Sequence, residues 1–104
     1  MEFKELMDLL RENDLTNAVR LGVLLALYYV GGYITFNDLR RSLAMPKSTL
    51  HKHLTALRER GLIEYRKGIT ILGVRAIVKL TDKGEAVVRK YLELVSRLDH
   101  EVRR

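Results

Sequence analysis

The sequence predicts a mainly α-helical fold with one small β-hairpin, and two observations point to this fold class. Apolar residues recur at spacings of three and four, as in helices, over most of the chain. Two short stretches, 62–66 and 74–80, are instead rich in β-branched and apolar residues, and Gly68 and Gly73 lie between them. Because the chain has 104 residues, we expect a single domain, 1–104, with a buried core.

The composition excludes several classes of protein. The chain has no cysteine, so it forms no disulfide, thiolate metal site or thiol redox sensor. Its most apolar segment, residues 21–30, has about half the length that a bilayer requires. Charged residues interrupt the apolar ones at the N-terminus, unlike in a secretion signal. We therefore expect a cytoplasmic protein without membrane association.

Two helices are predicted in the first third of the chain. An amphipathic helix is expected within residues 1–13, where the apolar residues at helical spacing are Phe3, Leu6, Met7 and Leu10. A second helix can be capped by Thr16 or Asn17 and stops at the glycines 31–32. Because this second helix is apolar nearly all round, we expect it to be central and covered on several sides.

A helix-turn-helix is predicted over residues 36–60. Thr35 or Asn37 can cap its first helix. The tight turn 44–46 ends in a proline, which can open the second helix at a position that needs no backbone donor. Ser48 is an alternative cap for that helix. The apolar face of the second helix consists of Leu50, His53, Leu54 and Leu57.

A hairpin over residues 62–80 and a long helix complete the chain. The two glycines between the strands bracket the tip of the hairpin. The last helix begins at Thr81 or Asp82 and occupies residues 82–104. Its predicted apolar stripe consists of Val88, Tyr91, Leu92, Val95 and Leu98.

The net charge of +6 is concentrated in one third of the chain. Residues 46–80 contain eight basic side chains and two acidic ones, whereas the basic and acidic residues elsewhere cancel. A contiguous excess of this kind predicts a basic surface that suits a polyanion.

The polar side of the second helix of the helix-turn-helix is the candidate binding surface. In this motif that helix lies in the DNA major groove and presents its N-terminal residues to base edges. A face that only meets water is the alternative, but the preceding turn, the local charge and the following hairpin favour DNA. The predicted major-groove residues are Lys47, Ser48, Thr49, His51, Lys52 and Thr55. The predicted phosphate contacts are Arg58, Arg66, Lys67 and Arg75.

Two segments, GYITFNDLRRSLAMPKSTLHKHLTALRERGLIEYRKG and VRAIVKLTDKGEAVVRKYL, carry a resemblance to a known family. They resemble the winged helix-turn-helix transcriptional regulators of the MarR/ArsR-like group, in particular a small archaeal and bacterial winged-helix DNA-binding family. The resemblance covers about residues 17–95, and its most specific parts are Leu50, His53-Leu54, Leu57, Gly61-Leu62-Ile63 and LTDKG at 80–84. It implies a dimeric DNA-binding regulator whose recognition helix opens at Pro46 and whose wing is the hairpin 62–80.

The sequence departs from that group at the tip of the wing. Regulators of this type often carry arginine or lysine there, whereas the tip is mostly apolar in this chain. Ile69, Ile71 and Leu72 either contact DNA or pack against their own domain or a neighbouring chain. For this reason we assign the wing contacts with DNA to the flanking basic residues.

The first and last helices predict a homodimer. Each has one apolar stripe, and a monomer of this size has little core left to cover both. A two-fold dimer through residues 1–13 and 82–104 would bury both stripes. It would also place two recognition helices about 34 Å apart, one turn of DNA.

We expect no cofactor and no metal. His51 and His53 are two residues apart on a helix and point to different sides, so they cannot chelate one ion together. His53 is expected to be a structural, partly buried ring bonded to the backbone. The tyrosines at 28, 29 and 33 either line a pocket for a small effector or belong to the core or a dimer interface. Without a nucleophile motif, phosphate loop or paired acids, we predict a non-enzyme.

Two other functions fit the same fold. A winged helix can be a protein-interaction module, in which the basic face meets an acidic partner and the apolar tip docks on it. A nucleoid protein that binds duplex DNA of any sequence would also share the fold. Sequence-specific regulation of transcription is the function we favour, with double-stranded DNA as the partner.

Overall fold

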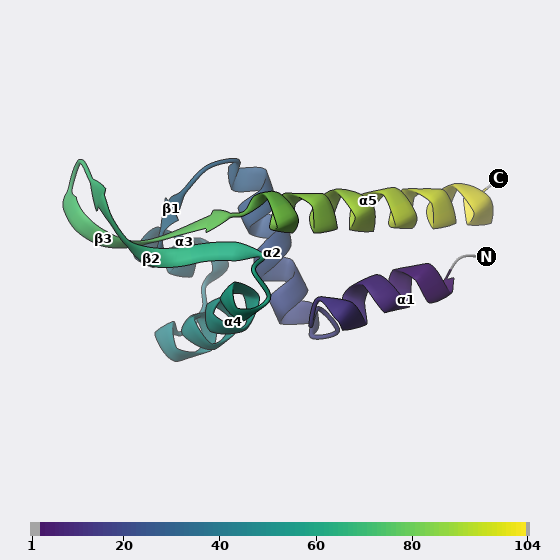
Figure 1. The fold of residues 1–104 in the computed structure, drawn as a ribbon, viewed down its shortest axis with the longest axis horizontal. Helices are drawn as coiled ribbons and strands as arrows, with labels where there is room; N and C mark the ends of the chain where they lie inside the picture. Colours follow the sequence, from purple (N-terminus) through teal and green to yellow (C-terminus); the bar gives the residue numbers. More distant parts are fainter. Residues whose placement is uncertain (1–2, 104) are drawn as a thin grey trace.

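The structure, a computed structural model, describes residues 3–103, so the predicted ranges 1–13 and 82–104 extend beyond it at residues 1, 2 and 104. Within these residues, the five helices and the two strands of the hairpin follow one another in the predicted order, and a third, short strand lies between the second and third helices (Figure 1). The helices are α1 (Phe3–Glu12), α2 (Ala18–Val30), α3 (Phe36–Leu43), α4 (Lys47–Glu59) and α5 (Asp82–Arg103). The strands are β1 (Ile34–Thr35), β2 (Ile63–Thr70) and β3 (Gly73–Leu80). The predicted fold class is confirmed.

Polar side chains cap α2 and α3 where the sequence offered two candidates each. Asn17, not Thr16, caps α2, and its side-chain oxygen accepts a hydrogen bond from the backbone N–H of Arg20 at 3.0 Å. Thr35, not Asn37, caps α3 in the same way. In both cases the cap is the residue directly before the first helical residue, from which a side chain can reach the free N–H groups of the first turn.

Helix α4 begins differently from the prediction. Pro46 was predicted to be the first residue of the helix. It is instead the N-cap residue, with φ −62° and ψ 149°, and the helix begins one position later, at Lys47. The alternative cap, Ser48, is wrong, because this residue lies inside the first turn and no side chain caps the helix. The first backbone N–H groups of α4 therefore have no side-chain acceptor among the described residues.

The sheet has three strands in the order β1-β3-β2, all antiparallel. The sequence predicted the hairpin but not the pairing of β1 with β3, in which Ile34 lies opposite Val78. Strand β2 is also longer than expected, because Gly68 pairs with Arg75 inside the ladder instead of bounding the tip. The tip therefore consists of only the two residues 71–72.

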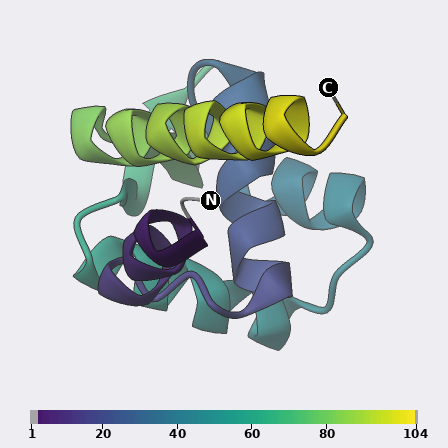
Figure 2. The ribbon, with the colours of Figure 1, turned by 90° about the vertical axis from the view of Figure 1, so that its right-hand side faces the viewer.

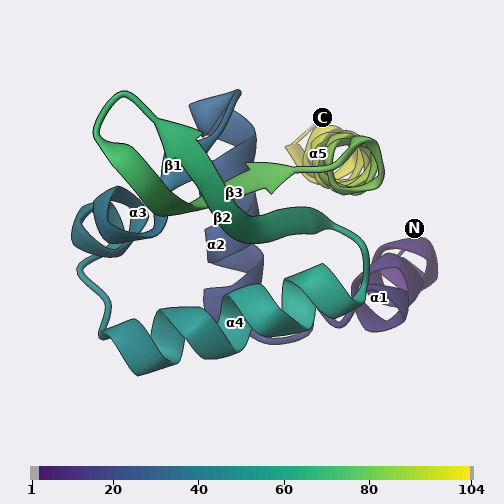
Figure 3. The ribbon, with the colours of Figure 1, turned by 60° about the vertical axis from the view of Figure 1, so that its left-hand side comes forward.

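The core lies where α2, α3 and α4 pack beneath the sheet (Figure 3). The fully buried side chains in this core are mainly leucines: Leu15, Val23, Leu24, Leu27, Leu39, Leu50, Leu54, Leu57, Leu62, Val78 and Val88. Helix α2 is central, as predicted, but it is not covered on all sides. Tyr29 is 73% exposed, and Val19 and Val30 are also exposed.

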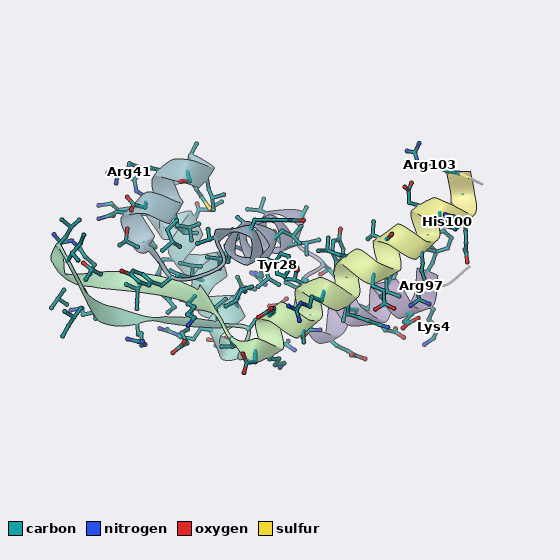
Figure 4. All side chains as sticks on the ribbon, turned by 90° about the horizontal axis from the view of Figure 1, so that it is seen from above. Lys4, Tyr28, Arg41, Arg97, His100 and Arg103 are labelled. Carbon is teal, nitrogen blue, oxygen red and sulfur yellow. The ribbon has the colours of Figure 1, made fainter. Side chains whose placement is uncertain are left out.

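Helices α1 and α5 lie side by side and project from the rest of the molecule (Figures 1 and 2). We call this pair the arm. Glu5 of α1 forms ion pairs with Lys90 at 3.1 Å and with Arg97 at 4.0 Å on α5. Figure 4 labels Arg97 on α5, where this helix lies above α1. The two apolar stripes thus cover each other in part within one chain.

The predicted stripe of α5 is wrong at Val95, which is exposed, while the neighbouring Leu94 is buried. The reason is that the partner of the helix changes along its length. The first half of α5 packs against α2 and β3, where Val88 is buried, whereas the second half packs against α1. The buried face therefore rotates around the helix, and one straight stripe cannot describe it.

The motif LTDKG, 80–84, joins α5 to the end of α4. The Thr81 hydroxyl donates to the carbonyl of Gly61 at 2.6 Å and accepts from the N–H of Gly84 at 3.0 Å, so Thr81 caps α5. Gly84 is buried, and a Cβ on it would lie 2.0 Å from the carbonyl oxygen of Leu62. Only glycine allows the two backbones to approach so closely.

Gly84→Ala should lower the free energy of unfolding by about 3 kcal/mol, because the added methyl group forces α5 away from the Leu62 carbonyl. Gly22→Ala in α2 is the matched control, since a Cβ there meets nothing within 4 Å. The control should raise the free energy of unfolding by about 0.5–1 kcal/mol. Urea titrations of both variants measure the difference, and equal effects would contradict the close approach at Gly84.

Candidate nucleic-acid interface

Helix α4 has one buried face and one exposed face, as predicted. Leu50, Leu54 and Leu57 are fully buried, and His53 is 5% exposed. The opposite face, which we call the α4 polar face, consists of Lys47, Ser48, Thr49, His51 and Lys52. Thr49 is half-buried and the other four are exposed. The structure thus brings five of the six predicted major-groove residues together at the N-terminal half of α4.

Thr55, the sixth, follows His51 by one turn and so lies on the same side of α4. It is half-buried, and its hydroxyl oxygen is buried with no hydrogen-bond partner within the described part of the chain. This hydroxyl is therefore less accessible than the side chains of the α4 polar face, and the contact of Thr55 with DNA stays a prediction.

The exposed cations on α4 and the wing differ in their partners. Lys47, Lys52 and Lys67 are exposed, and among residues 3–103 no carboxylate lies within ion-pair distance of them. Arg66 forms an ion pair with Glu64 at 3.5 Å. Arg75 is exposed and donates to its neighbour's carbonyl at 2.8 Å. The three lysines have their charges free for an anion.

Tyr65 of β2 connects the wing to both helices of the helix-turn-helix. Its hydroxyl is 2.9 Å from Nδ1 of His51 on α4, and its ring stacks on Phe36 of α3 at 6.0 Å. The guanidinium of Arg58 lies over the same ring at 5.2 Å and donates to the Tyr65 carbonyl at 2.9 Å. Burial raises the pKa of the Tyr65 hydroxyl, and the charge of Arg58 opposes that shift.

Tyr65 was not among the residues predicted to form the site. The available signal was the spacing of His51 and Arg58, seven residues apart and hence on the same face of α4. Both were assigned to DNA, whereas the structure places them against Tyr65 as well. This contact holds the orientation of α4 relative to the wing.

His53 is held by a side chain and not by the backbone as predicted. Nε of Arg20 on α2 donates to Nδ1 of His53 at 3.2 Å. The same guanidinium donates to the carboxylate of Asp14 at 2.6 Å, and the Arg20 side chain is only 11% exposed. Burial lowers the pKa of His53, and the positive charges of Arg20 and then Lys52 lower it further.

A pocket of about 360 Å³ lies where the end of α2 meets the start of α5. Tyr28 and Tyr29 line it together with Lys79 and Glu85, whereas Tyr33 is exposed and does not line it. Of the three tyrosines that were predicted to line either an effector pocket or the core, Tyr28 and Tyr29 line a pocket.

Among residues 3–103, no cluster of three or more His, Cys, Asp or Glu side chains has an arrangement that could bind a metal ion. Within the same residues, every helix is too short or too polar to span a bilayer.

The family model "Winged helix DNA-binding domain" matches residues 19–98. The chain belongs to this family. An uncharacterised protein of Methanocaldococcus jannaschii is 32% identical over 79 residues, which cover 76% of this chain and 86% of that protein.

Solved structures share the winged helix fold over nearly the whole chain. A transcriptional regulator homologue from Pyrococcus horikoshii OT3 has a TM-score of 0.80 and 25% identity, covering 97% of this chain and 96% of that one. MepR of S. aureus, in a complex with DNA, has a TM-score of 0.77 and 22% identity, covering 98% and 82%. A MarR-family regulator from Enterococcus faecalis V583 has a TM-score of 0.76 and 17% identity, covering 99% and 90%. The predicted resemblance to MarR-like winged helices is confirmed.

The buried His53 should make stability depend on pH. Since its pKa in the folded chain lies below the usual 6.5, the unfolded chain binds the proton more readily. The free energy of unfolding should be highest above pH 6.5 and fall as the pH drops below it, through the folded-state pKa. Urea titrations across this range measure the slope, and His53→Gln should make it shallower. An equally steep slope in the variant would assign the dependence to other groups.

Proposed function

We propose that this winged helix protein is a sequence-specific transcriptional regulator that binds double-stranded DNA as a homodimer in the cytoplasm. The observation that carries the proposal is the α4 polar face, where Lys47 and Lys52 are exposed and have no carboxylate partner among residues 3–103, on a helix whose other face is buried. The function is binding, and the proposal includes no catalysis.

In the proposed complex, the N-terminal half of α4 enters the major groove. Lys47, Ser48, Thr49 and Lys52 face base edges or the adjacent phosphates, and His51 adds its free ring nitrogen. The remaining nitrogens of Arg58 point toward the phosphates beside the groove. The wing contributes Arg66, Lys67 and Arg75 to the backbone. Two relatives of the same fold support this use, the P. horikoshii regulator homologue and MepR in its DNA complex.

The arm supports the homodimer. Phe3, Met7, Val95 and Val102 remain exposed by 37–64% on α1 and α5, although the two helices cover each other in part. A two-fold axis through this surface would bury these side chains and leave both α4 helices free. Helices α4 spaced by about 34 Å would then enter successive major grooves on one side of a palindromic site.

Lys52→Ala should lower the slope of log affinity against log salt by about one per DNA-bound subunit, because one phosphate contact is lost. Fluorescence anisotropy of a labelled duplex over a series of salt concentrations measures this slope. Arg89→Ala in α5 is the matched control, since it removes one exposed cation whose partner is Glu85. An unchanged slope for Lys52→Ala would remove this residue from the interface.

Sequence specificity is tested by comparing two duplexes of equal length and composition. One is the segment upstream of the protein's own gene and the other is its scrambled version. Tighter binding to the native duplex that persists at higher salt is expected for an autoregulating factor. Equal and steeply salt-dependent binding to both would favour a nucleoid protein or a regulator of another site, and no binding at low salt would overturn the proposal.

Phe3→Ser combined with Val95→Ser should shift a dimer toward monomer at micromolar concentration, because two aliphatic or aromatic contacts are lost from the interface of each chain. Sedimentation equilibrium measures the mass. Val19→Ser, which truncates an exposed apolar side chain of α2 outside the arm, should leave the mass unchanged. A parent chain that sediments as a monomer at tens of micromolar would exclude the dimer.

A further inference from the structure

The tip of the wing exposes four aliphatic side chains that the fold does not need. Ile69, Ile71, Leu72 and Val74 are 89%, 102%, 71% and 60% exposed. We call these four residues the wing tip. Ile69 and Val74 lie directly opposite each other on β2 and β3, and Ile71 and Leu72 form the turn between the strands. The packing alternative within the chain itself is thereby excluded, because side chains this exposed have no neighbours in their own core.

The turn is held in a defined shape despite its exposure. The Thr70 hydroxyl donates to the carbonyl of Gly73 at 2.9 Å and accepts from the N–H of Leu72 at 3.1 Å. Two hydrogen bonds from one side chain therefore close the turn from within. As a result Ile71 and Leu72 lie at the end of the hairpin in a turn that hydrogen bonds hold in place.

A second copy of the chain in the proposed dimer does not cover the wing tip. The tip lies at one end of a molecule 51 Å long, and the free ends of α1 and α5 lie at the other (Figure 1). Dimerisation through the arm leaves both tips at the outer edges of the assembly, on the same half of each chain as α4 (Figures 1 and 3).

The positive charge around the wing tip indicates what kind of molecule it binds. Between Glu64 and Asp82 the chain contains no acidic residue, and Arg66, Lys67 and Arg75 lie within a few residues of the tip. Lys67 belongs to the same face of the hairpin as Ile69 and Val74. Because the wing tip is apolar and the charged residues near it in the sequence are all basic, it suits a polyanion that also has an apolar surface. Duplex DNA does so between its stacked bases, and isoleucine and leucine are among the side chains that proteins insert between base steps from the minor groove.

We propose that Ile71 and Leu72 form a wedge that enters a base step of the DNA minor groove beside the major groove occupied by α4. The wedge partly unstacks that step and kinks the duplex, while the flanking cations contact the phosphates on either side. This inference rests on the proposed function, because it needs α4 to bind the duplex first. Flexible pyrimidine–purine steps, such as TA, are the preferred positions of the wedge, since they unstack at the lowest cost.

The test separates bending from binding. The probe is an A·T-rich duplex with TA steps, labelled at its two ends with a donor and an acceptor dye, and 2-aminopurine replaces adenine at the TA steps. At saturating wild-type protein, energy transfer between the ends and 2-aminopurine fluorescence should both rise. Ile71→Ser combined with Leu72→Ser should abolish both changes. Its affinity should fall by about tenfold or less, because burial of the side chains and unstacking of the step oppose each other.

Both substituted residues are exposed, so the double variant should fold, and Val19→Ser is the matched control that should bend DNA like the wild type. Wild-type binding without bending, or bending that survives in the double variant, would overturn the wedge and leave the proposed function intact. In that case unchanged affinity of the double variant would also exclude a contribution of the wing tip to DNA binding. No binding of the wild type to the duplex at low salt would overturn the wedge and the proposed function together.

Discussion

The orientation of α4 depends on one junction, where the end of α4, the start of β2 and the start of α5 meet at Leu62. Its side chain is fully buried, and its N–H donates to the carbonyl of Leu57 in α4 at 3.1 Å. Its own carbonyl accepts from the N–H of Thr81 at 3.1 Å and lies against Gly84. Because all three elements meet one residue through backbone contacts, the positions of α4, the wing and the arm are coupled at Leu62. A change at the arm, such as the proposed dimerisation, would reach α4 through this backbone junction.

Polar contacts complete this support on two sides of α4. Arg20 holds His53 from α2, and Tyr65 holds His51 and Arg58 from the wing. His53 is buried, so the bond from Arg20 satisfies a ring nitrogen that water does not reach, whereas His51 and Arg58 make their contacts at the surface. Lys47, Ser48 and Lys52 at the N-terminal end of α4 remain exposed, and this is the part that the geometry of a helix-turn-helix presents to base edges. Because α4 is already held in place before it binds, binding would cost less conformational entropy than it would for a mobile helix.

The helices, the hairpin and most of the core could be predicted from the sequence, because they follow from local periodicity and capping chemistry. Leu50, Leu54 and Leu57 share a helical face whatever the rest of the chain does. What could not be predicted depends on pairing between distant elements. The bond from Arg20 to His53 spans 33 residues. The addition of β1 to the sheet depends on its pairing with β3. The rotation of the buried face of α5 depends on which helix or strand packs against each part of α5.

The arm, α4 and the wing tip lie in that order along the molecule, and this order gives the proposed complex a definite form. If the arms meet at the two-fold axis, the two α4 helices lie on either side of it and the two wing tips lie farthest out. Any kink that the tips produce would then occur at the two flanks of the binding site and not at its centre. Wedges in the minor groove bend DNA toward the major groove. Two such bends would keep the flanking duplex close to the basic residues of the wing, so that the cations and the apolar tip reinforce each other in holding the bent DNA.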